Sequence, residues 1–428
     1  MAREVVVVAG LRTPFAKAGA DLDPVPVREL GRTATRELLD RTGLDPAAID
    51  AVIFGCAGPP ADTANPARVI ALRSGIPERV PAHTVARNCA SGLEAVTEAV
   101  ELIRSGRADT VLAGGVESMS RFPLQYPRSF AKKLASLSRA RNLFERLLGL
   151  LAFRPRDFKP VITILEGLSD PVTGEIMGLT AERLAREYAV SRDEQDAYAL
   201  RSHQRAIAAR EFLAGEIAPV AIPPRLESRL AADVGPRETQ SLAALAKLRP
   251  YFDRRAGTVT VGNSCPVTDG GVSLILMAGE KAEAEGLRPL GKILGHAYRG
   301  LDPLRMGLGP VHATGPALRE AGIRLADLDV IELNEAFAAQ VIACQRAFAS
   351  KETGERLGYP EAVGEIDEAR LNPNGGAIAL GHPVGATGAR QVLTLLRELR
   401  RRGGGLGLAT LCIGGGQGGA IVVEGMPS

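Results

Sequence analysis

Residues 372–390 read NPNGGAIALGHPVGATGAR and hold one histidine, His382, between Gly381 and Pro383. The apolar residues 377–380 predict a strand that leads into this turn, and the pattern from residue 386 predicts a helix. Glycine allows a tight turn, and proline fixes φ where the chain leaves it. We therefore expect the imidazole at the mouth of a strand–turn–helix unit, with few side chains around it. Its functional interpretation is a catalytic base, and its alternative is a histidine satisfied within the turn.

Two further glycine-containing stretches each carry a cysteine: VARNCASGLEAV at 85–96 holds Cys89, and LCIGGGQGG at 411–419 holds Cys412. Cys89 precedes a helical pattern, and the free amides of a helix N-terminus favour a thiolate. Cys412 precedes three glycines, whose N–H groups can converge on an oxyanion. Two thiols and an imidazole predict sulfur chemistry. The alternatives are a buried core cysteine at 89 and an ordinary tight turn after 412.

Asn334 lies between a predicted strand and the helix predicted for residues 335–349. It is either the N-cap of that helix or the holder of a catalytic water.

The composition indicates a globular protein of two or three domains: 428 residues, 45% hydrophobic and 24% charged. A net charge of +3 does not indicate nucleic-acid binding. The five cysteines are widely spaced and form neither a disulfide framework nor a metal-ligand pattern. No signal peptide or membrane span is predicted. We therefore expect a cytoplasmic location.

Strands and helices alternate through residues 1–120, which predicts an α/β fold with a parallel or mixed sheet covered by helices. The alternation of strands and helices stops at residue 121 and resumes at residue 251. We predict a first core domain from 1–120 and 251–280, an inserted loop domain at 121–250, and a second core domain at 281–428. Residues 258–261 and 273–277 are expected to be strands separated by turns, and residues 351–370 a polar loop.

Two stretches repeat one pattern: GLDPAAIDAVIFGCA at 43–57 and GIRLADLDVIELNEA at 322–336. A glycine, an aspartate seven residues later and an apolar run fall in register, and each copy lies upstream of a glycine-rich turn with a reactive residue. This predicts a duplicated α/β domain with the active site at the seam between its halves.

Residues 129–153, SFAKKLASLSRARNLFERLLGLLAF, repeat Phe130, Leu137, Phe144 and Leu151 at intervals of seven among many basic side chains. The pattern predicts a basic amphipathic helical segment. It either packs on the body of the protein or on a partner subunit, or it contacts a membrane surface.

Four motifs occur in an order that resembles the thiolase family: NCASGLEAV at 88–96, LNEAFAAQ at 333–340, the stretch 372–390, and CIGGGQG at 412–418. Supporting stretches resemble it too: RTPF at 12–15, GGVESMS at 114–120, MGLTAE at 177–182, SRDEQDAYALRSHQRA at 191–206, LAKLRPYF at 245–252 and GTVTVGNS at 257–264. The resemblance implies a duplicated fold of two similar α/β core domains with layered helices and mixed sheets, and a loop domain over the active site. It also implies a homodimer or a dimer of dimers.

The reaction implied by the resemblance is reversible acyl transfer between acyl-CoA thioesters and coenzyme A, without a metal or redox cofactor. Cys89 would be acylated, and His382 would take its proton. Cys412 would protonate the departing enolate in thiolysis or remove the α-proton of acetyl-CoA in condensation. Asn334 would hold a water that, with His382, stabilises the thioester oxygen. The amides of Cys89 and Gly414 would form a second oxyanion hole.

For coenzyme A the resemblance implies contacts by five residues: Met177, Arg237, Ser264, Cys265 and Phe337. Met177 and Phe337 would line the pantetheine channel, and Arg237 would meet the nucleotide. Several members of the family have serine where this chain has Cys265, and many have histidine where it has Ile176.

Within the family, the basic insertion at 129–153, the loop 351–370 and AHTV at 82–85 resemble the β-oxidation multienzyme branch, although that branch commonly has histidine in place of Asn334. This favours a degradative 3-ketoacyl-CoA thiolase and leaves a hydratase/dehydrogenase partner subunit open. The alternatives are an acetoacetyl-CoA-forming acetyltransferase, a condensing ketoacyl synthase, which typically uses one cysteine and two histidines, and a non-catalytic acyl-CoA or lipid-binding protein.

Overall fold

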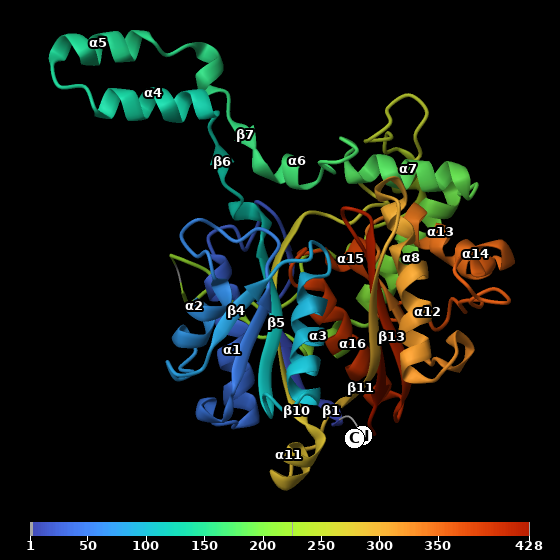
Figure 1. Ribbon diagram of the computed structural model, residues 1–428. Coiled ribbons are helices and arrows are strands. Elements are labelled where there is room, and N and C mark those ends of the chain that lie inside the picture. The colour runs from blue at the N-terminus through green and yellow to red at the C-terminus, as the bar shows by residue number, and fades with distance from the viewer. Residues whose placement is uncertain (1–2, 225, 428) are drawn as a thin grey trace.

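Ten strands form one mixed sheet in the computed structural model, which describes residues 3–224 and 226–427 (Figure 1). The strands are β1 (Val5–Arg12), β2 (Ala16–Lys17), β3 (Ala51–Gly55), β4 (Ala82–Val85), β5 (Thr110–Ser118), β10 (Thr268–Ala278), β11 (Gly291–Gly300), β12 (Val330–Leu333), β13 (Gly405–Ile413) and β14 (Gln417–Gly425). Their order is β12-β13-β14-β11-β1-β10-β5-β3-β4, and β2 pairs with β10.

The sheet has the same topology on either side of the central β1–β11 pair. On one side β1, β10 and β5 are antiparallel neighbours, and β3 joins β5 in parallel. On the other side β11, β14 and β13 are antiparallel neighbours, and β12 joins β13 in parallel. The core is therefore duplicated.

The repeat at 43–57 and 322–336 occupies equivalent places in the two halves. Gly43 and Gly322 end helices α1 (Val27–Thr42) and α12 (Gly309–Ala321) with φ of 68° and 71°, a conformation that favours glycine. The aspartate seven residues later lies just before a strand, and its carboxylate accepts a hydrogen bond from the parallel strand beside it. Asp50 accepts from the Thr110 N–H at 2.9 Å, and Asp329 accepts from the Leu406 N–H at 2.8 Å.

Alternating side chains place the sheet between helical layers. In β1, Val5 and Val7 face the core around helices α3 (Ser91–Arg104) and α16 (Thr387–Arg401), whereas Val6 and Val8 face α1 and α2 (Pro66–Arg73). The outer face of the other half packs on α12 and α13 (Ala338–Phe348). Helices α3 and α16 thus form a central layer enclosed by both halves of the sheet (Figure 1).

The two central helices approach each other through glycines near their N-termini. A Cβ added at Gly92 of α3 would lie 2.8 Å from the Gly385 oxygen, and one at Gly388 of α16 would lie 2.6 Å from the Leu93 Cβ. Because Cys89 immediately precedes α3 and His382 immediately precedes the turn into α16, this contact brings the two candidate residues to the same place.

Residues 121–250 form most of the remaining structure beside the sheet. Their elements are β6 (Leu124–Gln125), α4 (Arg128–Ser138), α5 (Leu143–Leu151), β7 (Val161–Ile162), α6 (Thr163–Gly167), α7 (Met177–Glu187), α8 (Arg192–Ala208), α9 (Arg210–Ala214), β8 (Val220–Ala221), β9 (Arg229–Leu230) and α10 (Leu242–Ala246). Three short helices complete the chain: α11 (Gly279–Ala284), α14 (Lys351–Arg356) and α15 (Ala377–Leu380). Ser191 and Glu194 form a capping box at the start of α8.

The basic amphipathic segment does not pack on the body of the protein. It forms two helices, α4 and α5, which fold back on each other and project from the rest of the molecule on the β6–β7 stalk (Figure 1). Every residue of the two helices is described, and none is buried. The seven-residue repeat therefore does not lie along one helix, because the chain turns between Ser138 and Leu143.

Four other local predictions are wrong. Residues 377–380 form α15 rather than a strand, because the Leu380 N–H bonds to the Gly376 oxygen and the Ile378 N–H bonds to the Glu335 carboxylate. Residues 258–261 are not a strand, and the expected turn at 269–271 lies inside β10, where those residues pair with β5. The loop predicted at 351–370 begins with α14.

Candidate active site

Four of the five predicted catalytic residues line one cavity of about 580 Å³: Cys89, His382, Cys412 and Gly414. A second cavity, of about 510 Å³, adjoins it and shares His382, Met177, Cys265 and Phe337 as wall residues. The residues come from both halves of the duplicated core, as the predicted position at the seam requires. Asn334 lies outside both sets of lining residues.

Cys89 sits in a tight turn at the N-terminus of α3. The preceding residue, Asn88, has a φ of 45°, and its carbonyl oxygen accepts a hydrogen bond from the Ser91 hydroxyl at 2.7 Å. The Ser91 hydroxyl also accepts from the Arg87 N–H at 2.9 Å. The turn presents the Cys89 thiol to the cavity, and it remains partly accessible although protein atoms surround it.

The Cys89 thiol does not have the low pKa expected at a helix N-terminus. Burial raises its pKa, and the backbone amides of Gly414 and of Cys89 itself act in the opposite direction without cancelling the effect. Desolvation disfavours the thiolate more than these amides stabilise it. Cys89 is therefore protonated at neutral pH and needs a base to become a nucleophile.

His382 has the geometry of that base. The Thr387 hydroxyl donates to the Pro383 oxygen at 3.0 Å, so its oxygen accepts from the His382 Nδ1, which lies 2.6 Å away. Nδ1 therefore carries the proton. Nε2 has no hydrogen-bond partner among the described residues and is free to accept one.

Protein surrounds His382, contrary to the expectation of an unshielded imidazole. Its side chain is only 6% exposed, and burial, assisted by the charge of Arg390, lowers its pKa to about 4. The imidazole is thus neutral at physiological pH. Gly381 turns the chain with a φ of 105°, and a Cβ there would lie 2.5 Å from the Thr268 hydroxyl oxygen.

Cys412 and Gly414 lie at the end of β13, where the chain turns into β14. Cys412 is 1% exposed, and burial, together with the neighbouring thiols of Cys89, Cys344 and Cys265, raises its pKa well above the ordinary value. Gly415 and Gly416 take φ of 88° and 76°. The Gly414 oxygen accepts a hydrogen bond from the Asn88 Nδ2 at 2.8 Å, which joins this turn to the Cys89 turn.

Asn334 is not the N-cap of α13. That helix begins at Ala338, and Phe337 occupies the cap position. The Asn334 N–H donates to the Thr410 oxygen at 2.9 Å, and the residue is 1% exposed. Neither polar atom of its side chain has a partner within the described chain, which is unusual for a buried amide.

The second cavity contains all five residues predicted to contact coenzyme A: Met177, Arg237, Ser264, Cys265 and Phe337. Arg237 is exposed, and Lys17, which the sequence did not single out, lines the same cavity. The Ser264 hydroxyl donates to the Thr260 oxygen at 2.7 Å, so it already has one partner. A largely apolar channel with basic side chains among its wall residues suits a ligand that has a slender arm and phosphates.

Two buried carboxylates tie the site together, and sequence reasoning missed both. Glu117 accepts hydrogen bonds from the backbone N–H groups of Ala57, Gly58 and Gly385. Burial raises its pKa. It joins the end of β5 to the loop that follows His382. The available signal was an acidic residue inside the apolar and glycine-rich stretch 110–119.

Glu335 is the second of these carboxylates. It accepts hydrogen bonds from the Tyr198 and Ser202 hydroxyls at 3.0 and 2.6 Å and from the Ile378 N–H at 3.1 Å. It therefore fixes α15, the short helix before His382, against α8 of the inserted region. Thr387 was also missed, although it lies five residues after His382 within the same motif.

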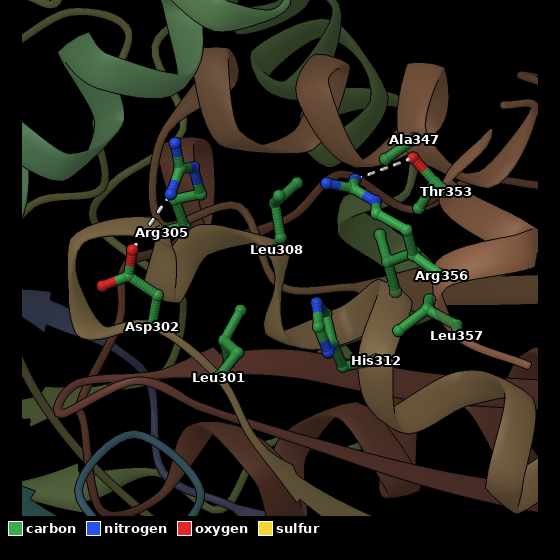
Figure 2. Close-up of a pocket in the computed structure, with 10 residues that line it drawn as sticks. Leu301, Asp302, Arg305, Leu308, His312, Ala347, Thr353, Arg356 and Leu357 are labelled. Atoms are coloured by element: carbon green, nitrogen blue, oxygen red, sulfur yellow. Dashed lines mark hydrogen bonds and ion pairs between the residues drawn. The ribbon is translucent and has the colours of Figure 1, made fainter.

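A separate hollow of about 200 Å³ lies between residues 301–312 and 347–357 (Figure 2). Its lining residues include His312 and Arg356. None of the predicted catalytic or coenzyme-binding residues lines it. His83 lies elsewhere on the surface, where its Nε2 contacts Glu98 at 2.7 Å.

Comparisons with known proteins give matches over nearly the full length of the chain. The thiolase N-terminal domain family matches residues 5–280, and the thiolase C-terminal domain family matches residues 287–425. The chain is 42% identical over 427 residues to a 3-ketoacyl-CoA thiolase of Pectobacterium carotovorum subsp. carotovorum (strain PC1), covering 99% of this chain and 97% of that one. It is 44% identical over 424 residues to that of Aeromonas salmonicida (strain A449), covering 98% and 96%.

Solved structures are similar over the full length. The acetyl-CoA acetyltransferase of Bacillus anthracis has a TM-score of 0.86 at 36% identity, with 99% of each chain covered. Human mitochondrial 3-ketoacyl-CoA thiolase in complex with CoA has a TM-score of 0.85 at 35% identity, covering 99% of this chain and 98% of that one.

Proposed function

The chain belongs to the thiolase family, and we propose that it is an acyltransferase that cleaves 3-ketoacyl-CoA into acetyl-CoA and an acyl-CoA shortened by two carbons. The observation that supports this most strongly is the shared cavity of Cys89, His382 and Cys412. The thiols of Cys89 and Cys412 and the unpartnered imidazole nitrogen in this cavity supply a nucleophile, a separate acid and a base.

In the first half-reaction, the Cys89 sulfur attacks the 3-keto carbonyl carbon while the His382 Nε2 takes the thiol proton. The bond between C2 and C3 then breaks, and the departing enolate takes a proton from Cys412. This releases acetyl-CoA and leaves a thioester on Cys89. The raised pKa of Cys412 suits this step, because the thiol keeps its proton until a strong base forms beside it.

In the second half-reaction, the thiol of a new coenzyme A loses its proton to the Cys412 thiolate and attacks the acyl carbon on Cys89. The Cys89 sulfur leaves and recovers its proton from His382. The thioester itself acidifies the α-carbon, so we propose coenzyme A as substrate and no metal or redox cofactor.

Two oxygen atoms of the substrate gain negative charge during the proposed reaction, and each is stabilised by its own hydrogen-bond donors. The amides of Cys89 and Gly414 stabilise the oxygen of the intermediate formed on Cys89. The buried, unpartnered amide of Asn334 holds a water that, with His382, stabilises the thioester oxygen of acetyl-CoA.

Thiolysis of acetoacetyl-CoA and of a long-chain 3-ketoacyl-CoA by the purified protein, with Cys89→Ala as control, tests the function. We expect the long chain to be preferred, because apolar residues such as Phe122, Leu168 and Met306 line the cavity that contains Cys89. A preference for acetoacetyl-CoA would make the protein an acetyl-CoA acetyltransferase. Binding without turnover of either substrate would make it a non-catalytic acyl-CoA-binding protein.

We also propose a homodimer, a partner subunit with hydratase/dehydrogenase activity and a cytoplasmic location. Strand β4 ends the sheet and pairs only with β3 within the described chain, so its free edge can pair with the same strand of a second copy. The five free cysteines suit a reducing compartment. Light scattering of the purified protein, alone and with a candidate partner, tests the assembly.

The projecting hairpin of α4 and α5 supports contact with an anionic membrane surface. Residues 128–159 carry nine basic and two acidic side chains, a net charge of +7, whereas the whole chain carries +3. Helix α5 exposes large apolar side chains, among them Leu143 at 83%, Phe144 at 69% and Leu151 at 73%. Such a combination favours peripheral binding. None of the helices among the described residues has the length and apolar character to cross a bilayer.

Sedimentation with vesicles of anionic lipid tests this contact. We expect binding that weakens with salt, and we expect loss of binding in a variant with Leu143→Ser, Phe144→Ser and Leu147→Ser. Neutral vesicles serve as the control. Equal binding of the variant, or equal binding to neutral vesicles, would show that the hairpin has another partner.

A further inference from the structure

Two neighbouring side chains of the nucleophile turn reach across the seam to the glycine turn at 414–417. The Asn88 Nδ2 donates to the Gly414 oxygen at 2.8 Å, and the Arg87 Nη1 donates to the Gln417 Oε1 at 3.4 Å. Arg87 belongs to the first half of the duplicated core and Gln417 to the second. The two turns that form the catalytic cavity are thus joined by side chains as well as by the packing of α3 on α16.

The backbone around Asn88 fixes the direction of its side chain. Its φ of 45° is a left-handed conformation that asparagine tolerates better than most residues. Its carbonyl oxygen accepts from the Ser91 N–H at 3.0 Å as well as from the Ser91 hydroxyl. Arg87 is held by Glu94 at 2.6 Å and by the ring of Tyr298, whose centroid lies 4.2 Å from the guanidinium carbon.

Packing restrains one end of the glycine turn, because a Cβ at Gly416 would lie 2.4 Å from the Leu301 oxygen, but it leaves Gly414 open. Gly414 has no side chain, and the nearest atoms to a Cβ placed there would be the Met177 Sδ at 3.5 Å and the Asn88 Nδ2 at 3.8 Å. The two residues that follow are also glycines. Glycine has wide conformational freedom. The hydrogen bond from Asn88 therefore adds a side-chain restraint at the Gly414 oxygen to the pairing of Ile413 with Gln417 that closes the turn. Gly414 lines the same cavity as Cys89, and its backbone amide acts to lower the pKa of the Cys89 thiol against the larger effect of burial.

We propose that Asn88 is a positioning residue for the acyl transfer proposed above: its carboxamide holds Gly414 so that the Gly414 N–H points at the oxyanion that forms beside Cys89. When the sulfur of Cys89 adds to the carbonyl carbon, the thiol proton goes to His382 and the carbonyl electrons move to oxygen. A donor helps only if it is fixed where that charge develops. Asn88 supplies the fixation and does not itself contact the reacting atoms.

Two substitutions remove the donor while keeping the turn. Asn88→Asp is nearly isosteric but offers an acceptor to the Gly414 oxygen, and Asn88→Gly adopts the φ of 45° without strain. Loss of one oxyanion donor typically costs about 10²–10³ in rate. For a donor that is loosened rather than removed, we expect Cys89 acylation by a 3-ketoacyl-CoA to slow by roughly 10–100-fold in single-turnover experiments.

Alkylation of Cys89 by iodoacetamide distinguishes positioning from a merely structural role. It needs the same thiol but forms no oxyanion, so we expect its rate in both variants to stay within about twofold of the unsubstituted protein. Asn142→Asp is the matched control. Asn142 caps α5 in the distant hairpin through its side-chain oxygen, and aspartate caps equally well, so both rates should be unchanged.

Acylation at the unsubstituted rate in both Asn88 variants would overturn the proposal. Equal slowing of acylation and alkylation would overturn it as well, because Asn88 would then maintain the turn without a role in oxyanion binding. If the unsubstituted protein forms no acyl-enzyme, the thiolase reaction itself is wrong for this chain.

Discussion

The central pair α3 and α16 and the projecting pair α4 and α5 are both made of two amphipathic helices, but they use their apolar faces in opposite ways. Most residues of α3 and α16 are buried between the halves of the sheet, whereas neither α4 nor α5, which the structure describes in full, has one buried residue. The difference teaches that amphipathic sequence alone does not determine burial. What separates the pairs is glycine at the central contact and basic charge on the projecting pair.

The base of the hairpin shows how the projecting pair holds its shape without the body. Tyr126, Phe130, Phe153 and Phe158 form an aromatic cluster with centroid distances from 4.5 to 5.6 Å. Lys133 also bonds to Asp157 at 2.5 Å. We therefore expect changes beyond this base to leave the catalytic centre intact, and changes in the central pair to disable it.

The largest expected effect is at the tip of the central pair. Cys89→Ala should lower thiolysis by roughly 10⁴-fold or more, because it removes the nucleophile, while leaving the fold intact. Mass spectrometry after incubation with substrate should show no acyl-protein. Cys344→Ala, which removes a buried thiol that lies outside the lining of the catalytic cavity, should still be acylated. A covalent acyl group on the Cys89→Ala protein would contradict the mechanism.

The second effect concerns pH. Because burial raises the pKa of Cys89, its alkylation by iodoacetamide should still accelerate about tenfold per unit as pH rises through 8, with no plateau near neutrality. A rate already constant at pH 7 would show the low-pKa thiolate that the helix N-terminus alone predicts.

The pH dependence of thiolysis below neutrality tests the lowered pKa of His382. The pKa of His382 is lowered to about 4, so the imidazole stays neutral and basic as pH falls below 6.5 and is lost as a base only near pH 4. We expect kcat/KM, corrected for any unfolding, to show no inflection at 6.5 attributable to this histidine. An inflection there that disappears in Thr387→Val would assign an ordinary pKa to His382.

A matched pair of glycines compares the two regions in stability. Gly92→Ala puts a methyl group 2.8 Å from a backbone oxygen that cannot move independently, so we expect a loss of about 1–3 kcal/mol. Gly149→Ala meets only the Leu137 Cδ1, at 2.9 Å, which can rotate away. There the gain in helix propensity of up to about 1 kcal/mol should leave stability equal or higher. Denaturant unfolding measures both, and equal losses would mean that the hairpin is as tightly packed as the centre.

The smallest expected effect is that of substitutions in the α4–α5 hairpin on the rate of thiolysis. The variant with Leu143→Ser, Phe144→Ser and Leu147→Ser should keep kcat/KM for acetoacetyl-CoA within about twofold, since these side chains are exposed and outside the catalytic cavity. Loss of more than tenfold in vesicle-free assays would show that the hairpin supports the active site directly.

The sequence predicted the parts of the site that carry their own local signature. Cys89, His382 and Gly414 each lie in a turn that glycine or a helix start marks, and the repeat at 43–57 and 322–336 indicated the duplicated core. Glu335 and Thr387 were missed because their importance depends on partners 5 to 137 residues away. The pKa of Cys89 was misjudged for a related reason: a helix N-terminus is visible in sequence, but the depth of burial that opposes it is not. Likewise, residues 377–380 were predicted to be a strand but form helix α15, whose Ile378 N–H bonds to the carboxylate of Glu335 in the LNEAFAAQ motif.

Strand β1 has a consequence for how the protein is made. Its apolar residues 5–8 lie at the middle of the sheet between β10 and β11, so it is synthesised roughly 260 residues before either partner. At about 5–20 residues per second on the ribosome, this strand waits for roughly 15–50 s without its neighbours. A chaperone that shields residues 5–8 during translation should therefore raise the yield of active protein, and a polar substitution on one face of β1 should reduce its aggregation at the expense of the finished core.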